Sequence, residues 1–423
     1  MPQSQPTDSS KPSALSVFRY RDYSLLWVVM MASGMGAWLR ILGTAQWLLE
    51  DTQSAWLVGA IGFVQLVVQT PALLWGGTLA DRLDRKRLMV LSHSLTALTL
   101  LTLGVLLVLD ELTPLWAYVG IALTAMSHVF ASPARSALIP VIVPERQLLA
   151  AASMDTASQN VAAIAGPLLF AVVAATAGLH LVLLLGGVLF LVAALVPLAL
   201  KVEGRAAAEA VPGTTAQKTE TTWQQTRAGL SYVKRHPILP GLFLLDIGIT
   251  VVSFYRDILP VLALGLFAGG AAASGLLGAA NSMGAVVGSF AALLFIGYRA
   301  KGMLVLYASL AYAVFLFGFG AATTLWFGML MIALLGAADA VTVAVRHTTV
   351  MIATPDHMRG RAFSLMYLAA YTANNLGTLW VGFWAGLIGA AHSMLLGAVL
   401  AILATAAIGF WWRPIRTFRS NDH

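Results

Sequence analysis

Runs of about twenty apolar residues, separated by short polar turns, recur along almost the whole of this 423-residue chain. An α-helix rises about 1.5 Å per residue, so about twenty residues cross the roughly 30 Å hydrocarbon core of a bilayer. Only 10% of the residues are charged, against about 25% in soluble domains. A segment exposed to lipid must satisfy its own backbone hydrogen bonds. The chain is therefore predicted to be an all-α integral membrane protein.

The apolar runs predict twelve transmembrane helices, which short connections force to run antiparallel to their neighbours. The predicted spans are 24–48, 55–79, 88–109, 115–138, 152–177, 179–199, 238–264, 271–297, 302–321, 325–347, 361–388 and 391–412. A polar linker, 201–237, with an amphipathic stretch near 223–233, separates six spans from six. We therefore expect a tail (1–23), a six-helix bundle (24–200), the linker, a second bundle (238–412) and a second tail (413–423).

The two halves share landmarks at a fixed offset of 211 residues, as transporters built from repeats do. This offset pairs His128 with Asp339, Arg135 with Arg346, Pro144 with Pro355, Glu145 with Asp356, and Gly166 with Gly377. The pattern favours two pseudo-symmetric six-helix bundles.

Basic residues predict the orientation of the chain in the membrane. All 25 lysines and arginines except Arg40 and Arg256 lie in the tails, the even-to-odd loops or the adjoining helix ends. The opposite loops carry acidic residues, such as Asp110, but neither lysine nor arginine. Because cytoplasmic loops retain positive charge, both termini and the linker are predicted to be cytoplasmic, in the inner membrane of a bacterium. The net charge of +7 then reflects topology rather than a nucleic-acid partner.

The loop between spans 2 and 3, GTLADRLDRKR, combines a glycine with closely spaced charges. Setting the topology alone is one interpretation. The loop also resembles the signature of the major facilitator superfamily, with Asp84 in place of the usual second glycine, as in its enterobactin-exporter and macrolide-efflux branch. FRYRDYSLLW, SPARSALIPVIVP and TPDHMRGRAFSLM extend the resemblance over most of the chain. The residues of this signature are Gly77, Asp81, Arg82, Asp84, Arg85 and Lys86.

The resemblance implies a two-bundle transporter that works as a monomer by alternating access. In that superfamily the residue matching Asp81 contacts the start of helix 11, here Gly360 and Arg361, and holds the cytoplasmic side shut. We group Arg135 and Arg346 with this cytoplasmic gate. The pair Gly166–Pro167 in span 5 becomes a candidate flexing point.

We select six ionisable residues within the spans as candidates, since an ionisable group near the middle of a bilayer costs about 2.5–3.5 kcal/mol on insertion scales. They fall on spans 1, 4, 7 and 10, and the resemblance implies that these helices line a central cavity. Snorkelling of the two arginines, a structural Arg256–Asp257 pair and an inert histidine remain alternatives. The candidate cavity residues are Arg40, His128, Asp246, Arg256, Asp257 and Asp339.

These residues predict a function. Asp246 and Asp339 suit groups that alternately take up and release a proton, and guanidinium groups bind carboxylates well. We expect proton-coupled export, by antiport, of a small amphipathic or anionic molecule, siderophore-like or drug-like as in multidrug resistance. A proton-coupled importer is the main alternative, followed by a membrane sensor and a membrane-embedded enzyme. HExxH, GxSxG and nucleotide-binding motifs are missing and the chain has no cysteine, so we expect no enzyme, metal or cofactor, and a proton gradient as energy source.

Overall fold

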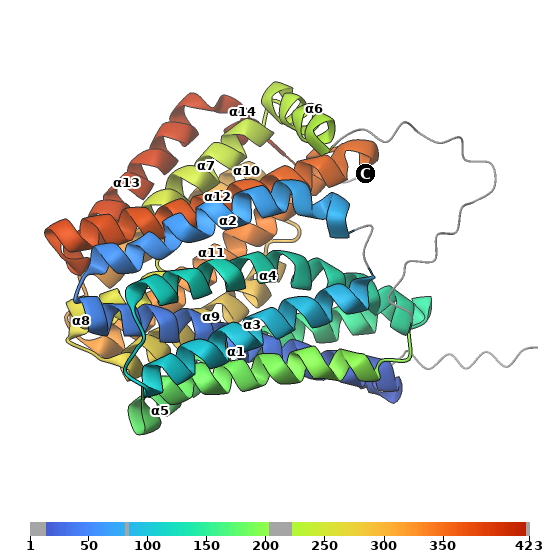
Figure 1. Cartoon of the computed structure of the whole chain (residues 1–423). Coiled ribbons are helices and arrows are strands. Elements are labelled where there is room, and N and C mark those ends of the chain that lie inside the picture. The colour runs from blue at the N-terminus through green and yellow to red at the C-terminus, as the bar shows by residue number, and fades with distance from the viewer. Residues whose placement is uncertain (1–13, 81–83, 203–221, 420–423) are drawn as a thin grey trace, which may run out of the picture.

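The computed structural model describes residues 14–80, 84–202 and 222–419, and within these ranges the regular elements are all helical (Figure 1). The first half contains η1 (Ala14–Arg19), α1 (Arg21–Thr52), α2 (Ala55–Ala80), α3 (Arg85–Val108), α4 (Pro114–Ile142), η2 (Glu145–Gln147), α5 (Leu148–Leu195) and η3 (Val196–Ala199). After α6 (Thr222–Arg235), the second half contains α7 (Leu239–Ser253), η4 (Arg256–Ile258), α8 (Leu259–Phe267), α9 (Ala271–Leu293), α10 (Lys301–Gly320), α11 (Leu325–Ala353), α12 (Asp356–Ile388), α13 (Ala390–Trp411) and α14 (Arg413–Thr417).

Ten segments of the described residues are long and apolar enough to cross a membrane. One of them, Glu145–Ala199, holds the predicted spans 5 and 6, because α5 reverses at Gly178. This residue has φ 83° and ψ 170°, a conformation that glycine adopts without a steric penalty. The 33-residue α12 supplies span 11. The structure thus confirms an all-α integral membrane fold with the predicted number of spans.

The predicted span 7 is divided into two helices. The backbone of α7 ends at Ser253, Phe254 is extended, and α8 begins at Leu259 with Pro260 in its first turn. Proline lacks an N–H and is tolerated at the start of a helix but not in its interior. The break places Arg256 and Asp257 in a short 3-10 turn between the two helices.

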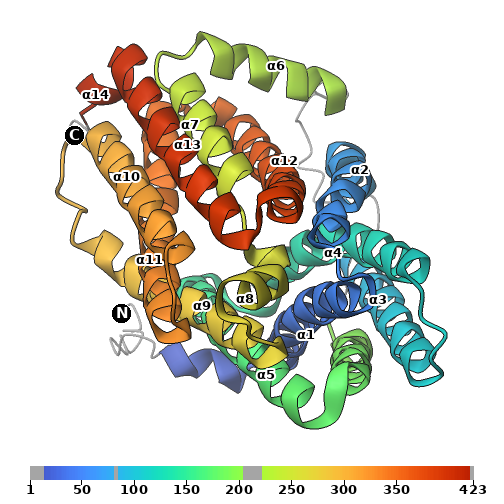
Figure 2. The ribbon, with the colours of Figure 1, turned by 90° about the vertical axis from the view of Figure 1, so that its left-hand side faces the viewer.

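The helices form two bundles, α1–α5 and α7–α13, that lie side by side (Figures 1 and 2). We call the ends next to the linker the linker side, and the opposite ends the far side. The bundles meet along two seams, α2 against α12 and α5 against α9, and α8 also packs on α1. Each bundle contains one of the two cavities described below.

Small residues bring the seams together near the far side. A Cβ added to Gly59 would lie 2.7 Å from the Cα of Gly382, and one added to Gly275 would lie 2.6 Å from the Cβ of Ala171. Such contacts allow helix backbones to approach closely in a membrane. Hydrogen bonds between described residues also cross between the bundles, from Asn375 Nδ2 to Gln69 Oε1 at 3.1 Å and from Ser274 Oγ to Gln46 Oε1 at 3.2 Å.

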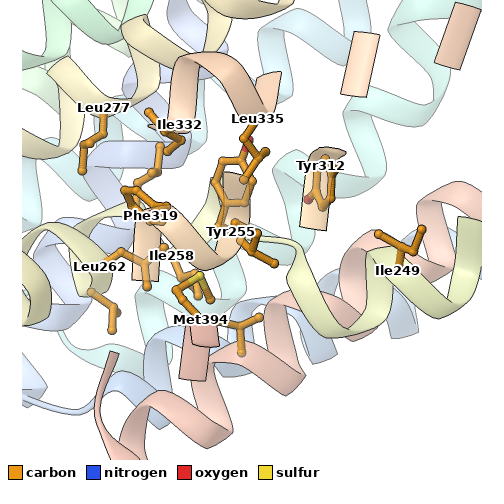
Figure 3. Packing of buried hydrophobic residues seen from close by; sticks show 14 of the residues in the cluster. Ile249, Tyr255, Ile258, Leu262, Leu277, Tyr312, Phe319, Ile332, Leu335 and Met394 are labelled. Atoms are coloured by element: carbon orange, nitrogen blue, oxygen red, sulfur yellow. The ribbon is translucent and has the colours of Figure 1, made fainter. Parts of the chain in front are cut away.

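The core of the second bundle packs around the break in span 7. Figure 3 shows Ile258 and Leu262 lying near Phe319 and Met394, with Tyr255 and Tyr312 at the edge of the cluster. Phe319 and Leu262 are fully buried. Apolar packing therefore surrounds the non-helical turn and holds it at a fixed depth.

The linker helix α6 covers the stretch predicted to be amphipathic. Its Val233 is buried against Leu239, Val350 and Ala362, at the linker-side ends of α7, α11 and α12. The helix lies across these ends in Figure 2. Among the described parts of the linker, α6 thus belongs to the surface of the second bundle. The predicted limits of the tails, bundles and linker stay predictions.

Candidate functional site

Most of the ionisable residues predicted within the spans line two cavities, one in each bundle. The C-terminal cavity has a volume of about 430 Å³, lies among α7, α10, α11 and α12, and includes Asp246, Arg256 and Asp339. The N-terminal cavity has a volume of about 160 Å³, lies among α1, α3, α4 and α5, and includes Arg40 and His128. Five of the six candidate residues are therefore divided between two cavities instead of meeting in one, and the sixth, Asp257, lines neither.

The C-terminal cavity combines charged groups with aromatic hydroxyls. Asp339 on α11 lies close enough to Arg256 for their opposite charges to interact. The hydroxyl of Tyr312 lies 3.1 Å from Ser253 Oγ, and Asn281 donates a hydrogen bond to the hydroxyl of Tyr255. Both tyrosines line the cavity. The cavity can therefore contact a ligand through aromatic faces and hydroxyl groups as well as through carboxylate and guanidinium groups.

Two arginines at equivalent positions of the repeat make ion pairs within their own bundles. Arg135 on α4 pairs with Asp155 on α5, and Arg346 on α11 pairs with Asp246 on α7. Asp246, predicted in the cavity set, is thus joined to Arg346, predicted in the gate set, and both line the C-terminal cavity. The predicted cavity set and the predicted gate set therefore meet in one ion pair. The sequence did not indicate this contact, because the two partners are 100 residues apart.

The N-terminal cavity is dominated by basic groups. Arg40 donates a long hydrogen bond of 3.4 Å to Thr124 Oγ1, while His128 is exposed at the edge of the cavity. His93, on α3, also lines the cavity and is only 5% exposed. The carboxylate of Asp155 accepts hydrogen bonds from both Arg135 and Gln159.

Asp257 occupies a third position, at the boundary of the two bundles. It accepts a hydrogen bond of 3.5 Å from Thr378 on α12, and it interacts electrostatically with Arg40 of the first bundle. Among the described residues that line the two cavities, Asp257 does not appear. Its charge therefore links the bundles without belonging to either cavity.

Three members of the predicted gate, in the loop before α3 and at its start, make hydrogen bonds within the first bundle. Asp84 caps α3 by accepting a hydrogen bond from the backbone of Arg87 at 3.0 Å. Arg85 donates to the Ala137 carbonyl at 3.0 Å, and Lys86 donates to the Leu200 carbonyl at 2.7 Å. These bonds tie the start of α3 to the ends of α4 and η3.

The other predicted gate residues give a partial picture. Gly77 lies in α2, and Asp81 and Arg82 lie outside the described residues. A Cβ added to Gly360 would meet nothing within 4 Å, and Arg361 approaches the sulfur of Met358 one turn earlier in α12. The gate function assigned to this group stays a prediction.

The candidate flexing point forms close contacts between helices. A Cβ added to Gly166 would lie 2.8 Å from the Cβ of Trp38 on α1, and Pro167 packs against Gly278 of α9. The backbone of α5 continues through both residues, and the non-helical residue recorded in this helix is Gly178. A role for Gly166–Pro167 in bending stays a prediction.

Sequence reasoning left several cavity residues out of the predicted site. An acidic residue two turns into an apolar helix could have identified Asp155, and a histidine within an otherwise apolar helix could have identified His93. For the aromatic and hydroxyl groups no comparable signal exists, because such residues are common in membrane helices. The residues left out are His93, Asp155, Ser309, Tyr312, His347, Tyr367, Tyr371 and Asn374.

Known proteins resemble this chain over nearly its full length. A family profile described as "Transmembrane secretion effector" matches residues 12–423. The enterobactin exporter EntS of Citrobacter koseri is 26% identical over 402 residues, covering 94% of this chain and 88% of the relative. The enterobactin exporter EntS of Salmonella typhimurium is 25% identical over 403 residues, covering 94% and 88%.

Solved structures share the fold at low sequence identity. The nucleoside transporter NupG has a TM-score of 0.71 at 16% identity, covering 92% of this chain and 99% of its own. A POT family transporter in complex with a thioalcohol-conjugated peptide has a TM-score of 0.73 at 12% identity, covering 93% and 96%. A bacterial homologue of the human lysosomal transporter Spinster, in an inward-facing and unoccupied conformation, has a TM-score of 0.65 at 14% identity over all of both chains.

Proposed function

The chain belongs to the major facilitator superfamily, in the family of transmembrane secretion effectors, and we propose on this basis that it exports a small amphipathic or anionic molecule by alternating access. It is a multi-pass membrane transporter and not an enzyme. The proposed energy source is the proton gradient across the inner membrane of a bacterium, used by a monomer without a cofactor. Entry of a proton would be exchanged for exit of the substrate.

The observation that carries this proposal is the pair of cavities at membrane depth. An ionisable side chain within a bilayer is retained when it faces a polar cavity or a partner. Asp339 and Arg256 share the C-terminal cavity, and Arg40 and His128 share the N-terminal cavity. This arrangement favours a substrate route between the bundles over snorkelling of these residues toward lipid headgroups.

The seams support a state that is open toward the cytoplasm. Gly59, Gly382 and Gly275 hold the bundles together near the far side, while a Cβ added to Gly360, at the linker side, would meet no other group within 4 Å. The distribution of lysine and arginine favours a cytoplasmic location for the linker side. In the proposed cycle, opening of these far-side contacts releases the substrate to the outside.

Asp339 is the proposed proton carrier. Asp246 is engaged by Arg346, so its charge is already compensated within the second bundle. Asp339 has no ion-pair partner within 4.0 Å among the described residues, although Arg256 lies near enough to interact. A carboxylate without a close ion-pair partner binds or releases a proton more readily than a paired carboxylate when its surroundings change.

The substrate class follows from the cavity chemistry and the relatives. Tyr255, Tyr312 and Tyr371 offer aromatic faces and hydroxyl groups in the C-terminal cavity, and basic groups dominate the N-terminal cavity. The curated relatives are named as exporters of enterobactin. A siderophore-like molecule that carries aromatic and oxygen-rich acidic groups is therefore the proposed substrate.

Everted membrane vesicles test the direction and the coupling. We expect a substrate from a panel of siderophores, macrolides and dyes to accumulate in vesicles whose interior is acidic, and this accumulation to disappear when the gradient is collapsed. Vesicles that carry Asp339→Asn provide the matched control. Accumulation only when the gradient is reversed would identify an importer and contradict the proposal.

The orientation is tested separately with tags. A protease site inserted at the Asp110–Glu111 turn should be cut in intact spheroplasts, whereas a site in the linker should be cut only in everted vesicles. The reverse pattern would contradict the cytoplasmic placement of the linker side.

A further inference from the structure

A buried histidine that the transport scheme does not use lines the N-terminal cavity. His93 is 5% exposed, and its Nε2 atom has no hydrogen-bond partner in the described part of the chain. The imidazole packs beside Phe190, with ring centroids 5.8 Å apart. Burial of a polar atom without a hydrogen bond is unfavourable. A group that enters the cavity and bonds to His93 would remove this cost.

Besides Arg135, which is paired with Asp155, two further basic groups line the same cavity from other helices. Arg40 on α1 is 8% exposed, and its hydrogen bond to Thr124 is long, at 3.4 Å. His128 on α4 is exposed at the edge of the cavity. A guanidinium group carries five N–H donors in a planar fork, so the contact with Thr124 leaves most of this capacity unused.

The nearby carboxylates do not balance these donors. Asp155 is already bonded to Arg135 and Gln159. Asp257 interacts with Arg40 from the second bundle, but it accepts its hydrogen bond from Thr378 and does not line the cavity. The described lining of the N-terminal cavity therefore contains basic side chains but no carboxylate.

We propose that the N-terminal cavity is an oxyanion subsite, in which Arg40, His93 and His128 bind the acidic group of the transported molecule. A cavity of about 160 Å³ accommodates one acidic group with an attached ring, and the remainder of the molecule extends toward the C-terminal cavity. Charge-assisted hydrogen bonds from guanidinium to carboxylate supply the specificity. The inference rests on the proposed transport function, to which it adds the location and chemistry of one subsite.

Direct binding of a small aromatic carboxylate tests the subsite. The full-length protein, in nanodiscs of neutral lipid, is titrated calorimetrically with benzoate and with its uncharged counterpart benzyl alcohol. We expect saturable binding of benzoate and much weaker binding of benzyl alcohol. Arg40→Gln and His93→Leu should each weaken benzoate binding by about tenfold or more, since each removes a hydrogen bond to a charged group.

Two controls separate binding from folding. His93→Leu removes a buried polar atom that lacks a partner, so its thermal unfolding temperature without ligand should equal or exceed that of the unmodified protein. His392→Leu makes the same substitution on α13, at an exposed histidine outside the lining of both cavities, and should leave benzoate binding unchanged. Equal loss in His392→Leu, or no loss in His93→Leu, would overturn the assignment.

Competition identifies the source of the bound anion. Preference for benzoate over inorganic phosphate supports the acidic group of an organic substrate, whereas preference for phosphate overturns that part of the proposal. The two proposals fail independently. If benzoate binding depends on His93 but the protein does not export a substrate, only the exporter assignment is contradicted. If the protein exports a substrate but shows no such binding, only the subsite is contradicted.

Discussion

The N-terminal and C-terminal cavities occupy comparable places in the two bundles, but their side chains differ in charge and size. The repeat offset places His128 of the first bundle on Asp339 of the second, and both residues line their own cavity. The first cavity is basic and measures about 160 Å³, while the second is rich in tyrosine and measures about 430 Å³. A shared scaffold thus sets the depth of a position, and the residue at that position sets its chemistry.

The paired arginines show a second difference between the halves. Arg135 and Arg346 are related by the same offset, yet Arg135 bonds to α5 and Arg346 bonds to α7. The first ion pair joins the fourth span to the fifth, and the second joins the tenth to the seventh. Equivalent arginines therefore restrain non-equivalent helices, so the two bundles can respond differently to a ligand.

The largest expected effect separates the two repeat-related cavity residues. Asp339→Asn should abolish substrate accumulation driven by a proton gradient while substrate exchange without a gradient continues, because the neutral amide cannot carry the proton. His128→Gln should keep gradient-driven transport and weaken apparent substrate affinity by up to about tenfold. Both are measured in everted vesicles. If Asp339→Asn retained full gradient-driven transport, the proposal that Asp339 carries the proton and that the two cavities differ in function would be contradicted.

The next effect compares the two ion pairs. Arg346→Gln should destabilise the protein by about 3–5 kcal/mol, because it leaves the buried carboxylate of Asp246 without its partner. Arg135→Gln should cost less, since Gln159 still donates to Asp155 at 2.7 Å. The side chains of the Arg346–Asp246 pair are also less exposed, at 8% and 15%, than those of the Arg135–Asp155 pair, at 12% and 17%.

Unfolding in detergent measures this order, with the charge-neutral double variant Asp246→Asn/Arg346→Gln as control. The double variant should recover much of the lost stability, because neither charge then remains buried alone. A larger loss in Arg135→Gln than in Arg346→Gln would contradict the interpretation that the second pair is the more isolated one.

The sequence predicted the spans well because each span is encoded locally. The turn between spans 5 and 6 was placed at residue 178, where Gly178 reverses α5. The break in span 7 was not predicted, since the apolar composition continues through Leu259–Phe267 and Pro260 marks only the start of the second helix. Hydropathy measures how favourable the transfer of side chains from water to lipid is, and it does not show where the backbone leaves the helical conformation.

The site was predicted only in part, because its contacts join distant helices. Asp339 and His128 were predicted because each is an ionisable residue near the middle of a predicted span, and both line cavities. The pairing of Asp246 with Arg346 depends on how α7 packs against α11, which no local pattern encodes. His93 is a histidine within an otherwise apolar helix, which is a signal in the sequence, but no sequence pattern shows that its Nε2 atom lacks a hydrogen-bond partner among the described residues.

A smaller effect tests whether the two halves separate at the far side. Gly59→Ala adds a Cβ that would lie 2.7 Å from the Cα of Gly382, and overpacking of about 1–3 kcal/mol should open the α2–α12 seam. The chain has no cysteine, so a single Thr378→Cys reporter, at a fully buried position of α12 that faces Gly62 of α2 in this seam, can be labelled selectively. Labelling from the far side should rise by about fivefold or more.

Gly248→Ala is the matched control for this experiment. Its added Cβ would meet Ala404 at an ordinary distance of 3.6 Å, so labelling should not change. A rise in both variants would show that the reporter responds to any added methyl group. Unchanged labelling in Gly59→Ala would show that the seam adapts without opening.

The smallest expected effect concerns the linker helix, for which the described part of the first bundle has no counterpart. His236 Nδ1 accepts hydrogen bonds from the backbone of Ile238 and Leu239 at the start of α7. Burial lowers the pKa of the His236 imidazole below its ordinary value near 6.5, opposed by a hydrogen bond to the backbone of Ala353. The folded junction therefore favours the neutral ring, so the unfolded junction takes up a proton first as the pH falls below about 6.5.

Stability of the junction should consequently be complete above this pH and decline as the pH falls through the window below about 6.5. Hydrogen exchange of α6, corrected for the intrinsic effect of pH, should become faster from pH 7.5 to pH 5.5. The start of α3, held by Asp84 and Lys86, is the internal control and should change little. His236→Asn keeps a cap acceptor that does not titrate, so it should flatten the response of α6. An equal pH response in α3 would show that the effect belongs to the whole protein and not to the junction that distinguishes its second half.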